Sequence, residues 1–218
     1  MRILVINPNS TSAMTEDIAE AAKLAALSST EIVPRNPETG PVSIQGPEDG
    51  EAALPGLMQV FDEAMAEATA FDAVIIACFD DTGLQELKLR SPVPVLGIGE
   101  AAFHAACLCG GKFSTVTTLP VSVPIIEANI SSYGFDARSC GVRASNVPVL
   151  SIGRETARSI EEEAKTALAE DGCSTIVLGC AGMADLASSM SVELGAPVID
   201  GVAAAVGLCE AVLRLKAP

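Results

Sequence analysis

Short apolar runs alternate with longer amphipathic segments along most of the chain. The runs are rich in valine and isoleucine and are bounded by glycine, proline or asparagine, a pattern typical of buried strands. They cover residues 2–6, 31–34, 73–77, 93–98, 113–117, 147–150, 175–179 and 197–199. Strands that alternate with helices predict an α/β fold with a parallel sheet covered by helices on both sides.

Two of the segments between the runs have a clear helical period. In 154–170, apolar residues fall on one face, whereas three consecutive glutamates, 161–163, mainly face water. In 51–70, the apolar residues step by four, three, four and three, which predicts one buried face made of Leu54, Met58, Phe61, Met65 and Ala68.

The chain also resembles itself. Aligning Cys78 with Cys180 places 73–87 over 175–189, and 94–102 and 3–14 match 197–205 and 113–124 in the same order. Any α/β chain can be aligned with itself to some extent, but three ordered matches favour a duplication. We therefore expect two similar flavodoxin-like parallel-sheet subdomains related by a pseudo-two-fold axis, with the active site in the cleft between them. The predicted division is 1–98 plus 206–218 for the first subdomain and 99–205 for the second.

Composition narrows the function. The chain has 218 residues and a formal net charge of -15, which argues against binding nucleic acid or an anionic membrane. We recognise no signal peptide and no apolar run long enough to span a membrane, so we expect a cytoplasmic protein. The seven cysteines are an odd number, and free thiols are expected in that compartment.

Two of the cysteines stand where ligands bind in open α/β sheets. Cys78 and Cys180 each follow an apolar strand and precede a turn of small residues. A thiol beside a helix N-terminus is stabilised as the thiolate. Asp80 and Asp81 act in the opposite direction, because their charge raises a nearby thiol's pKa unless they cap the helix or point away.

A matched pair of thiols suits one kind of reaction. Inverting a carbon by proton transfer needs a base on one face and an acid on the other, and the roles swap for the opposite enantiomer. The enolate-like charge needs hydrogen-bond donors, for which the candidates are Asn7, Asn9, Ser10, Thr117 and Thr118. A single cysteine at a strand end is more often a packing residue, and we assign that role to Cys107, Cys109, Cys140, Cys173 and Cys209.

Other motifs carry less weight. Gly97, Gly99 and Ala102 fit a dinucleotide fingerprint, but the acidic ribose ligand expected about 20 residues later is missing. His104 is the only histidine, and we interpret it as a surface or packing residue. One histidine without a C-x-x-C pair disfavours a structural zinc site. We therefore predict no cofactor and no metal.

Several motifs together resemble one family. They are 7–11 (NPNST), 77–84 (ACFDDTGL), 117–119 (TTL), 122–127 (SVPIIE), 177–183 (VLGCAGM) and 197–202 (PVIDGV). They are similar to the hydantoin and allantoin racemase branch of the Asp/Glu racemase superfamily. The resemblance implies two α/β subdomains, no cofactor and a two-base mechanism with Cys78 and Cys180 as the acid/base pair. It also implies that the substrate pocket is lined by Asn9, Phe79, Thr117, Thr118 and Gly182.

The resemblance leaves the substrate open. Val121 stands where relatives often carry a basic residue, and the superfamily also contains amino-acid racemases and arylmalonate decarboxylases. No lysine or arginine lies inside the cysteine or threonine motifs, which favours a neutral ring, although Lys112, Arg138 and Arg143 are cations that could reach the site.

We expect a homo-oligomeric racemase of 5-substituted hydantoins acting on a small-molecule substrate. The alternatives are an allantoin racemase, an amino-acid racemase of the Asp/Glu type, a single-cysteine decarboxylase, or a two-lobed small-molecule sensor without catalysis.

Overall fold

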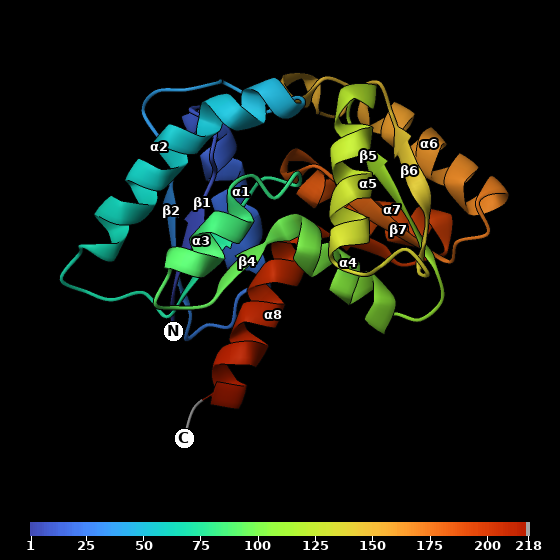
Figure 1. The fold of residues 1–218 in the computed structure, drawn as a ribbon. Coiled ribbons are helices and arrows are strands. Elements are labelled where there is room, and N and C mark those ends of the chain that lie inside the picture. The colour runs from blue at the N-terminus through green and yellow to red at the C-terminus, as the bar shows by residue number, and fades with distance from the viewer. Residues whose placement is uncertain (217–218) are drawn as a thin grey trace.

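Two parallel four-stranded sheets form the frame of the molecule (Figure 1). The structure is a computed structural model that describes residues 1–216. The first sheet has the order β2-β1-β3-β4 and the second has the order β6-β5-β7-β8. The strands are β1 (Arg2–Ile6), β2 (Glu31–Arg35), β3 (Ala73–Ile76), β4 (Val95–Gly97), β5 (Phe113–Thr117), β6 (Ser139–Ala144), β7 (Thr175–Gly179) and β8 (Val198–Asp200).

Helices cover both faces of each sheet, as the alternating pattern predicted. The α-helices are α1 (Ser12–Ala25), α2 (Pro47–Met65), α3 (Leu84–Arg90), α4 (Ile98–Leu108), α5 (Val123–Ser132), α6 (Ala157–Glu170), α7 (Ala187–Leu194) and α8 (Gly201–Lys216). Three short 3-10 helices, η1 (Pro120–Ser122), η2 (Val149–Ser151) and η3 (Ala181–Leu186), lie in the loops of the second half. Within the described residues, no helix is long and apolar enough to cross a membrane.

The predicted duplication is confirmed by the sheet topology. β1, β3 and β4 hold the same places in the first sheet as β5, β7 and β8 in the second, which are the pairs that the self-alignment matched. The order 2-1-3-4 within each half is that of the flavodoxin-like fold.

One strand prediction was wrong. Residues 147–150 do not form a strand, and the fourth strand of the second sheet is β6 instead. The run at 147–150 contains Pro148 and follows Asn146, whose φ of 60° breaks an extended conformation. Both of its valines are buried, because Val147 packs in the outer core of the second half and Val149 lines the pocket described below. β6 escaped the sequence pattern because it is an edge strand with every residue only partly buried.

The predicted helices exist, but the buried face of α2 is rotated by one residue. Its buried side chains are Ala53, Leu57, Val60, Phe61 and Ala64, whereas Ala68 of the predicted face lies beyond the helix. Two apolar stripes run along this helix, and the one with alanines lies against the sheet because small side chains permit close packing. In α6, Ile160 and Ala164 are buried as predicted.

Three apolar cores stabilise the fold, and one of them joins the two halves. The alternating residues of β1 illustrate the pattern, since Leu4 and Ile6 face an outer core with α2 and α3, while Ile3 and Val5 face an inner core. The second sheet has its own outer core with α6 and α7. The inner core is shared by both sheets and by α1, α4, α5 and α8.

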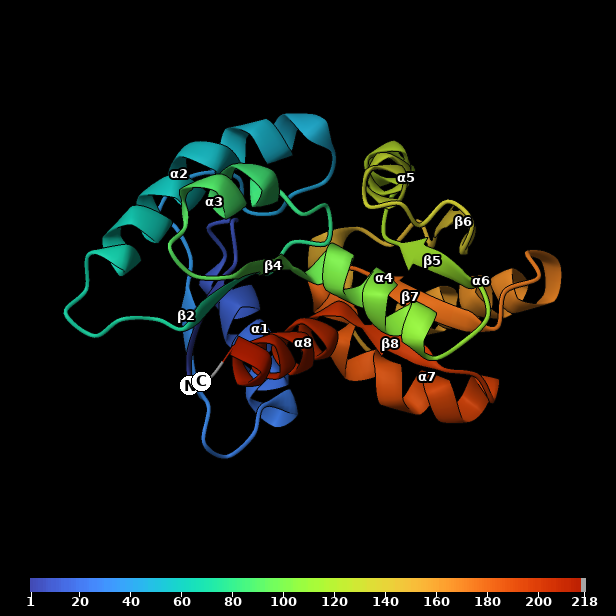
Figure 2. The same cartoon turned by 60° about the horizontal axis from the view of Figure 1, so that its bottom comes forward.

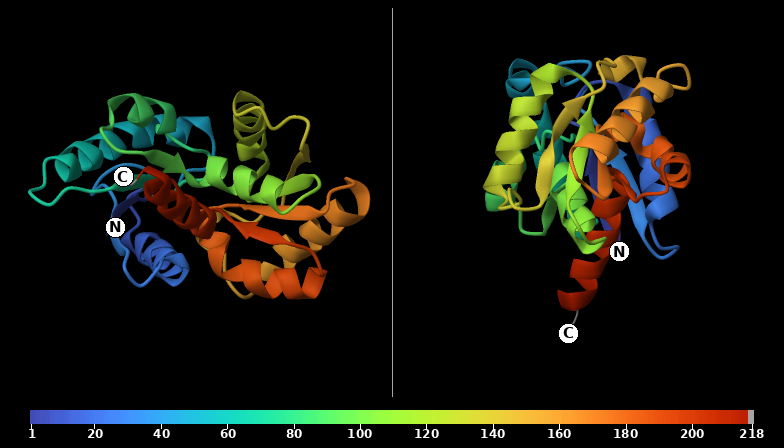
Figure 3. Two further views of the ribbon diagram at one scale, coloured as in Figure 1. Left: turned by 90° about the horizontal axis from the view of Figure 1, so that it is seen from below. Right: turned by 90° about the vertical axis from the view of Figure 1, so that its right-hand side faces the viewer.

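Figures 2 and 3 show α4 and α8 lying side by side between the two sheets. Helix α8 packs on α4 and α1 and also contacts strands of both sheets. The predicted division into 1–98 plus 206–218 and 99–205 stays a prediction, and residues 217–218 lie outside the described residues.

Candidate active site

The loops after four central strands converge on one pocket. These strands are β1 and β3 of the first sheet and β5 and β7 of the second, so both halves contribute through the carboxyl ends of their strands. The pocket is lined by Asn9, Met14, Ile44, Ala77, Cys78, Phe79, Asp80, Thr117, Thr118, Ser122, Val149, Gly179, Cys180 and Ala181.

Cys78 is held by the turn that follows β3. The amide of Asp81 donates to the carbonyl oxygen of Cys78 at 3.0 Å, which closes the turn. The amide of Asp80 and the hydroxyl of Thr82, at 3.5 Å, both donate to the Cys78 sulfur. The sulfur is therefore held by two residues of its own loop, and a third residue closes the turn around it.

Cys180 has the same backbone setting after β7. The amide of Met183 donates to the carbonyl oxygen of Cys180 at 3.1 Å, and the amide of Gly182 donates to its sulfur. The Thr117 hydroxyl donates to the carbonyl oxygen of Gly179 at 3.0 Å and ties β5 to this loop. A Cβ at Gly179 would lie 2.9 Å from the Thr117 Cβ, so this close approach requires glycine.

Both thiols are harder to ionise than the sequence suggested. They are half-buried, and loss of solvation raises the pKa of Cys180 to about 11 and that of Cys78 higher still. The charge of Asp80 raises both pKa values further. The prediction that the helix N-termini would favour the thiolate was wrong, because burial outweighs the amide donors.

The two aspartates after Cys78 have different surroundings. Asp81 is buried and accepts hydrogen bonds from the amides of Gly99 and Glu100 and from the Tyr133 hydroxyl, at 3.0, 2.8 and 2.9 Å. It therefore caps α4. Asp80 lines the pocket instead, and burial raises its carboxyl pKa to about 7 despite a hydrogen bond from Ser122.

The cap explains the glycines that mimic a dinucleotide motif. A Cβ at Gly97 would overlap a carboxylate oxygen of Asp81, and one at Gly99 would lie 2.9 Å from the other oxygen. The glycines thus make room for an aspartate at the N-terminus of α4, where a phosphate would bind in a dinucleotide site. In residues 1–216, no group of three or more histidine, cysteine or acidic residues could hold a metal ion.

Three of the five predicted donors line the pocket, namely Asn9, Thr117 and Thr118. Asn9 accepts a hydrogen bond from the Asn7 side chain at 2.9 Å and is held from behind by it. Asn7 and Ser10 do not line the pocket, since Ser10 donates to the carbonyl oxygens of the 40–41 loop.

Of the residues that the resemblance assigned to substrate binding, Gly182 alone lies elsewhere. Gly182 lines a neighbouring groove of about 770 Å³ between α1, η3 and α8. A Cβ there would still lie 3.8 Å from the Cys180 sulfur, so Gly182 is near the site through its backbone. Phe79 is buried at the pocket and packs edge-to-face on Phe103 at 5.6 Å.

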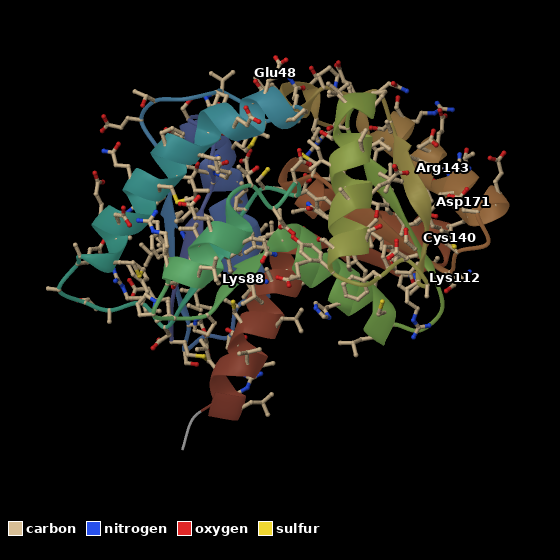
Figure 4. All side chains as sticks on the ribbon, viewed as in Figure 1. Glu48, Lys88, Lys112, Cys140, Arg143 and Asp171 are labelled. Carbon is tan, nitrogen blue, oxygen red and sulfur yellow. The ribbon has the colours of Figure 1, made fainter. Side chains whose placement is uncertain are left out.

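The cations that could have reached the pocket lie on the outer side of the second half. Figure 4 shows Lys112 and Arg143 there, far from the convergence of the loops. Arg143 is paired with Asp171 at 2.9 Å and with Glu163 and Glu170. Arg138 donates to the carbonyl oxygen of Gly111. Among the described residues that line the pocket, none is a lysine, arginine or histidine.

His104 and Val121 are also outside the pocket lining. His104 is exposed on α4, with its ring edge-to-face on Phe135 at 4.9 Å. Val121 packs on the loop before α2, where a Cβ at Gly46 would lie 2.7 Å from it. A basic residue at position 121 would therefore lie at this junction of the two halves.

The sequence missed the residues that close the pocket, Met14, Ile44, Ser122 and Val149. Ser122 lies within a recognised motif, but Ile44 and Val149 belong to loops without any period. The Val149 amide donates to the Gln45 side chain at 3.1 Å and joins these loops. The cavity measures about 30 Å³, room for a water molecule but not for a ring. A ring substrate must therefore widen this cavity to bind.

The arrangement brings groups suited to acid–base chemistry to one small cavity. Two thiols from equivalent loops line it together with hydroxyl, amide and carboxyl groups. The other five cysteines are also free thiols, and none of them lines the pocket.

Comparisons with known proteins agree with this geometry. A profile of the family described as Asp/Glu/Hydantoin racemase matches residues 3–209. The chain is 43% identical to a hydantoin racemase of Rhizobium meliloti, over 98% of this chain and 89% of that protein. It is 41% identical to a hydantoin racemase of Pseudomonas sp. (strain NS671), over 99% and 87%. The solved structure of an allantoin racemase from Klebsiella pneumoniae matches with a TM-score of 0.94 and 41% identity, covering 99% of this chain and 88% of that one.

Proposed function

This chain belongs to the Asp/Glu/hydantoin racemase family and is an isomerase, and from that premise we propose that it inverts C5 of 5-substituted hydantoins. The observation that carries the proposal is the pair of thiols, Cys78 and Cys180, which stand at equivalent strand ends and line one pocket. Proton transfer at a carbon between an N–H and a carbonyl group needs no further reactant.

The proposed reaction has two proton transfers. The thiolate of one cysteine takes the C5 proton and becomes a thiol, while the carbon's electron pair delocalises onto the ring carbonyl as an enolate. The thiol of the other cysteine then gives its proton to the opposite face of C5 and becomes a thiolate. For the other enantiomer the two cysteines exchange roles, which suits the near-symmetric backbone around them.

Hydrogen-bond donors in the pocket would stabilise the enolate. Thr118 is buried and lines the pocket, and so does Asn9, whose side-chain amide donates to the Met14 sulfur at 3.2 Å and has a second hydrogen. Such donors are most effective where a bound substrate displaces water from the site. Thr117 has a different role, since its hydroxyl is already used to hold Gly179 beside Cys180.

The pocket also bears on the substrate class. Aspartate and glutamate carry two carboxylates, which are usually bound by cations. The described lining of the pocket has no cationic side chain and contains a carboxyl group, Asp80. This favours a neutral ring. Allantoin is the second candidate, because the chain is 41% identical to a protein described as an allantoin racemase.

A polarimetric screen in deuterated buffer tests the proposal. We expect purified protein to racemise a 5-substituted hydantoin or allantoin with incorporation of solvent deuterium at C5, well above the rate without protein. Aspartate, glutamate and an arylmalonate should not react. Turnover of an amino acid but of no ring substrate would contradict the proposal, and binding without isotope exchange in any compound would favour a sensor.

A further inference from the structure

One residue of the pocket lining, Asp80, has a buried carboxyl oxygen without a hydrogen-bond partner within residues 1–216. Oδ2 of Asp80 is buried and has no hydrogen-bond partner among the described residues. A buried carboxyl oxygen without a partner is costly. The next residue shows the contrast, because the carboxylate of Asp81 is also buried but accepts three hydrogen bonds. Asp80 is therefore the carboxyl group that is available to a ligand.

The position of Asp80 links it to the reacting carbon. It lies two residues after Cys78, and its charge is felt by the sulfurs of both Cys78 and Cys180. It therefore lies close to the place where C5 must lie between the two thiols. None of the described lining residues is a cation that could pair with it, so a ligand that enters the pocket can supply the partner.

The chemistry of the reaction decides which ligand group that is. As the C5 proton leaves, negative charge develops on the carbonyl oxygen, and a carboxylate facing that oxygen would oppose the reaction. The donors Asn9 and Thr118 suit the carbonyl side. A carboxylate suits the other neighbour of C5, the ring nitrogen that carries a hydrogen.

We propose that Asp80 is a specificity-determining residue, which accepts a hydrogen bond from the ring N–H that is bonded to the inverted carbon. This rests on the proposed function and defines the substrate class further, as a neutral ring with N–H next to the acidic C–H. Asp80 selects for that N–H by a charge-assisted hydrogen bond and selects against carboxylates by repulsion.

The test pairs changes in the substrate with changes in the protein. The substrates are a 5-substituted hydantoin and its N1-methyl and N3-methyl derivatives. The wild-type protein should lose about 10-fold to 100-fold in kcat/KM on N1-methylation and much less on N3-methylation. The wild-type comparison does not depend on whether any variant folds.

The variant Asp80→Leu separates hydrogen bonding from bulk, since leucine keeps a similar volume without an acceptor. We expect it to turn over the N1–H and N1-methyl substrates at nearly equal rates, whereas Asp80→Asn, which keeps an oxygen acceptor but not the charge, should lie between. If Asp80→Leu, or Asp80→Ala where the leucine variant does not fold, discriminates as strongly as the wild type, the methyl group acts by steric exclusion and the proposal is wrong.

Binding gives a second readout without turnover. 5,5-Dimethylhydantoin has no C5 proton, and calorimetry should show that its affinity falls on N1-methylation in the wild type but not in Asp80→Leu. Racemisation of hydantoins with equal affinity for both compounds would overturn the role of Asp80 and leave the proposed function standing. No racemisation of any ring substrate would overturn both.

Discussion

The loops that carry Cys78 and Cys180 have the same backbone design but different side chains. In both, the residue three positions later closes the turn, and the amide two positions later donates to the sulfur. The side chain at that second position is Asp80 in the first loop and absent in the second, where Gly182 stands. The duplication thus preserved where each sulfur lies and let its electrostatic surroundings diverge.

The difference makes the two thiols unequal. Burial and then the charge of Asp80 raise the pKa of Cys78 above that of Cys180. In the proposed mechanism, Cys180 would therefore ionise first and Cys78 would start as the acid. The two enantiomers have equal free energy, so kcat/KM must be the same in both directions. A difference between the two thiol pKa values can therefore appear only as changes of kcat and KM by the same factor.

The strongest test removes each sulfur in turn. Cys78→Ala and Cys180→Ala should each lower the inversion rate by about 10²–10⁴-fold, the usual contribution of a general acid or base. Each variant keeps one base, so each should still exchange the C5 proton of one enantiomer with deuterium, and the two variants should prefer opposite enantiomers. Chiral chromatography with mass spectrometry measures both quantities.

Two outcomes would end the two-base mechanism. One is inversion at the wild-type rate by either variant, and the other is exchange of the same enantiomer by both. Cys173→Ala is the matched control, because this buried cysteine lies outside the pocket and should affect inversion little.

A smaller effect is expected from the residues that close the two turns. Asp81 is anchored by three hydrogen bonds, whereas its counterpart Met183 is fully buried in an apolar core. Asp81→Leu leaves buried donors unpaired and should lower the free energy of unfolding by about 2–4 kcal/mol. Met183→Leu nearly conserves volume and should cost less than about 1.5 kcal/mol.

Urea unfolding followed by circular dichroism measures both changes. Equal losses of stability in the two variants would show that the polar cap of α4 contributes no more than ordinary packing.

The smallest expected effect comes from making the second loop resemble the first. In Gly182→Asp a carboxylate is placed beside Cys180, since a Cβ there lies 3.8 Å from the sulfur and 3.2 Å from the mobile end of Ile152. The like charge should raise the pKa of Cys180, so its alkylation by iodoacetamide and the pH profile of kcat/KM should both move to higher pH.

Gly182→Asn provides the control for bulk without charge, and mass spectrometry resolves alkylation at each cysteine. A shift that is equally large in Gly182→Asn would show that the side chain acts by desolvation.

In the wild type, kcat/KM should rise with pH across the neutral range, because the base must be deprotonated and the pKa of Cys180 is raised to about 11.

Local patterns predicted most of the fold and part of the site. The duplicated strand order follows from short valine- and isoleucine-rich runs, and the two cysteines follow from their matched place in it. β6 was missed because an edge strand needs no apolar run, and Ile44 and Val149 because loops that close a pocket follow no period. The pKa directions of the thiols were missed because burial depends on tertiary packing. A homo-oligomeric assembly and a cytoplasmic location stay predictions.

The shared inner core has a consequence for changing the enzyme's substrate range. Phe103 of α4 contacts Phe79, which follows Cys78, and stacks on Phe113 of the second sheet at 5.4 Å. The loop that carries Cys78 thus packs, through Phe79, against the rings of Phe103 and Phe113, which lie outside the pocket lining. Engineering this protein for larger rings should therefore begin with the size of the side chain at position 103, behind the pocket rather than inside it.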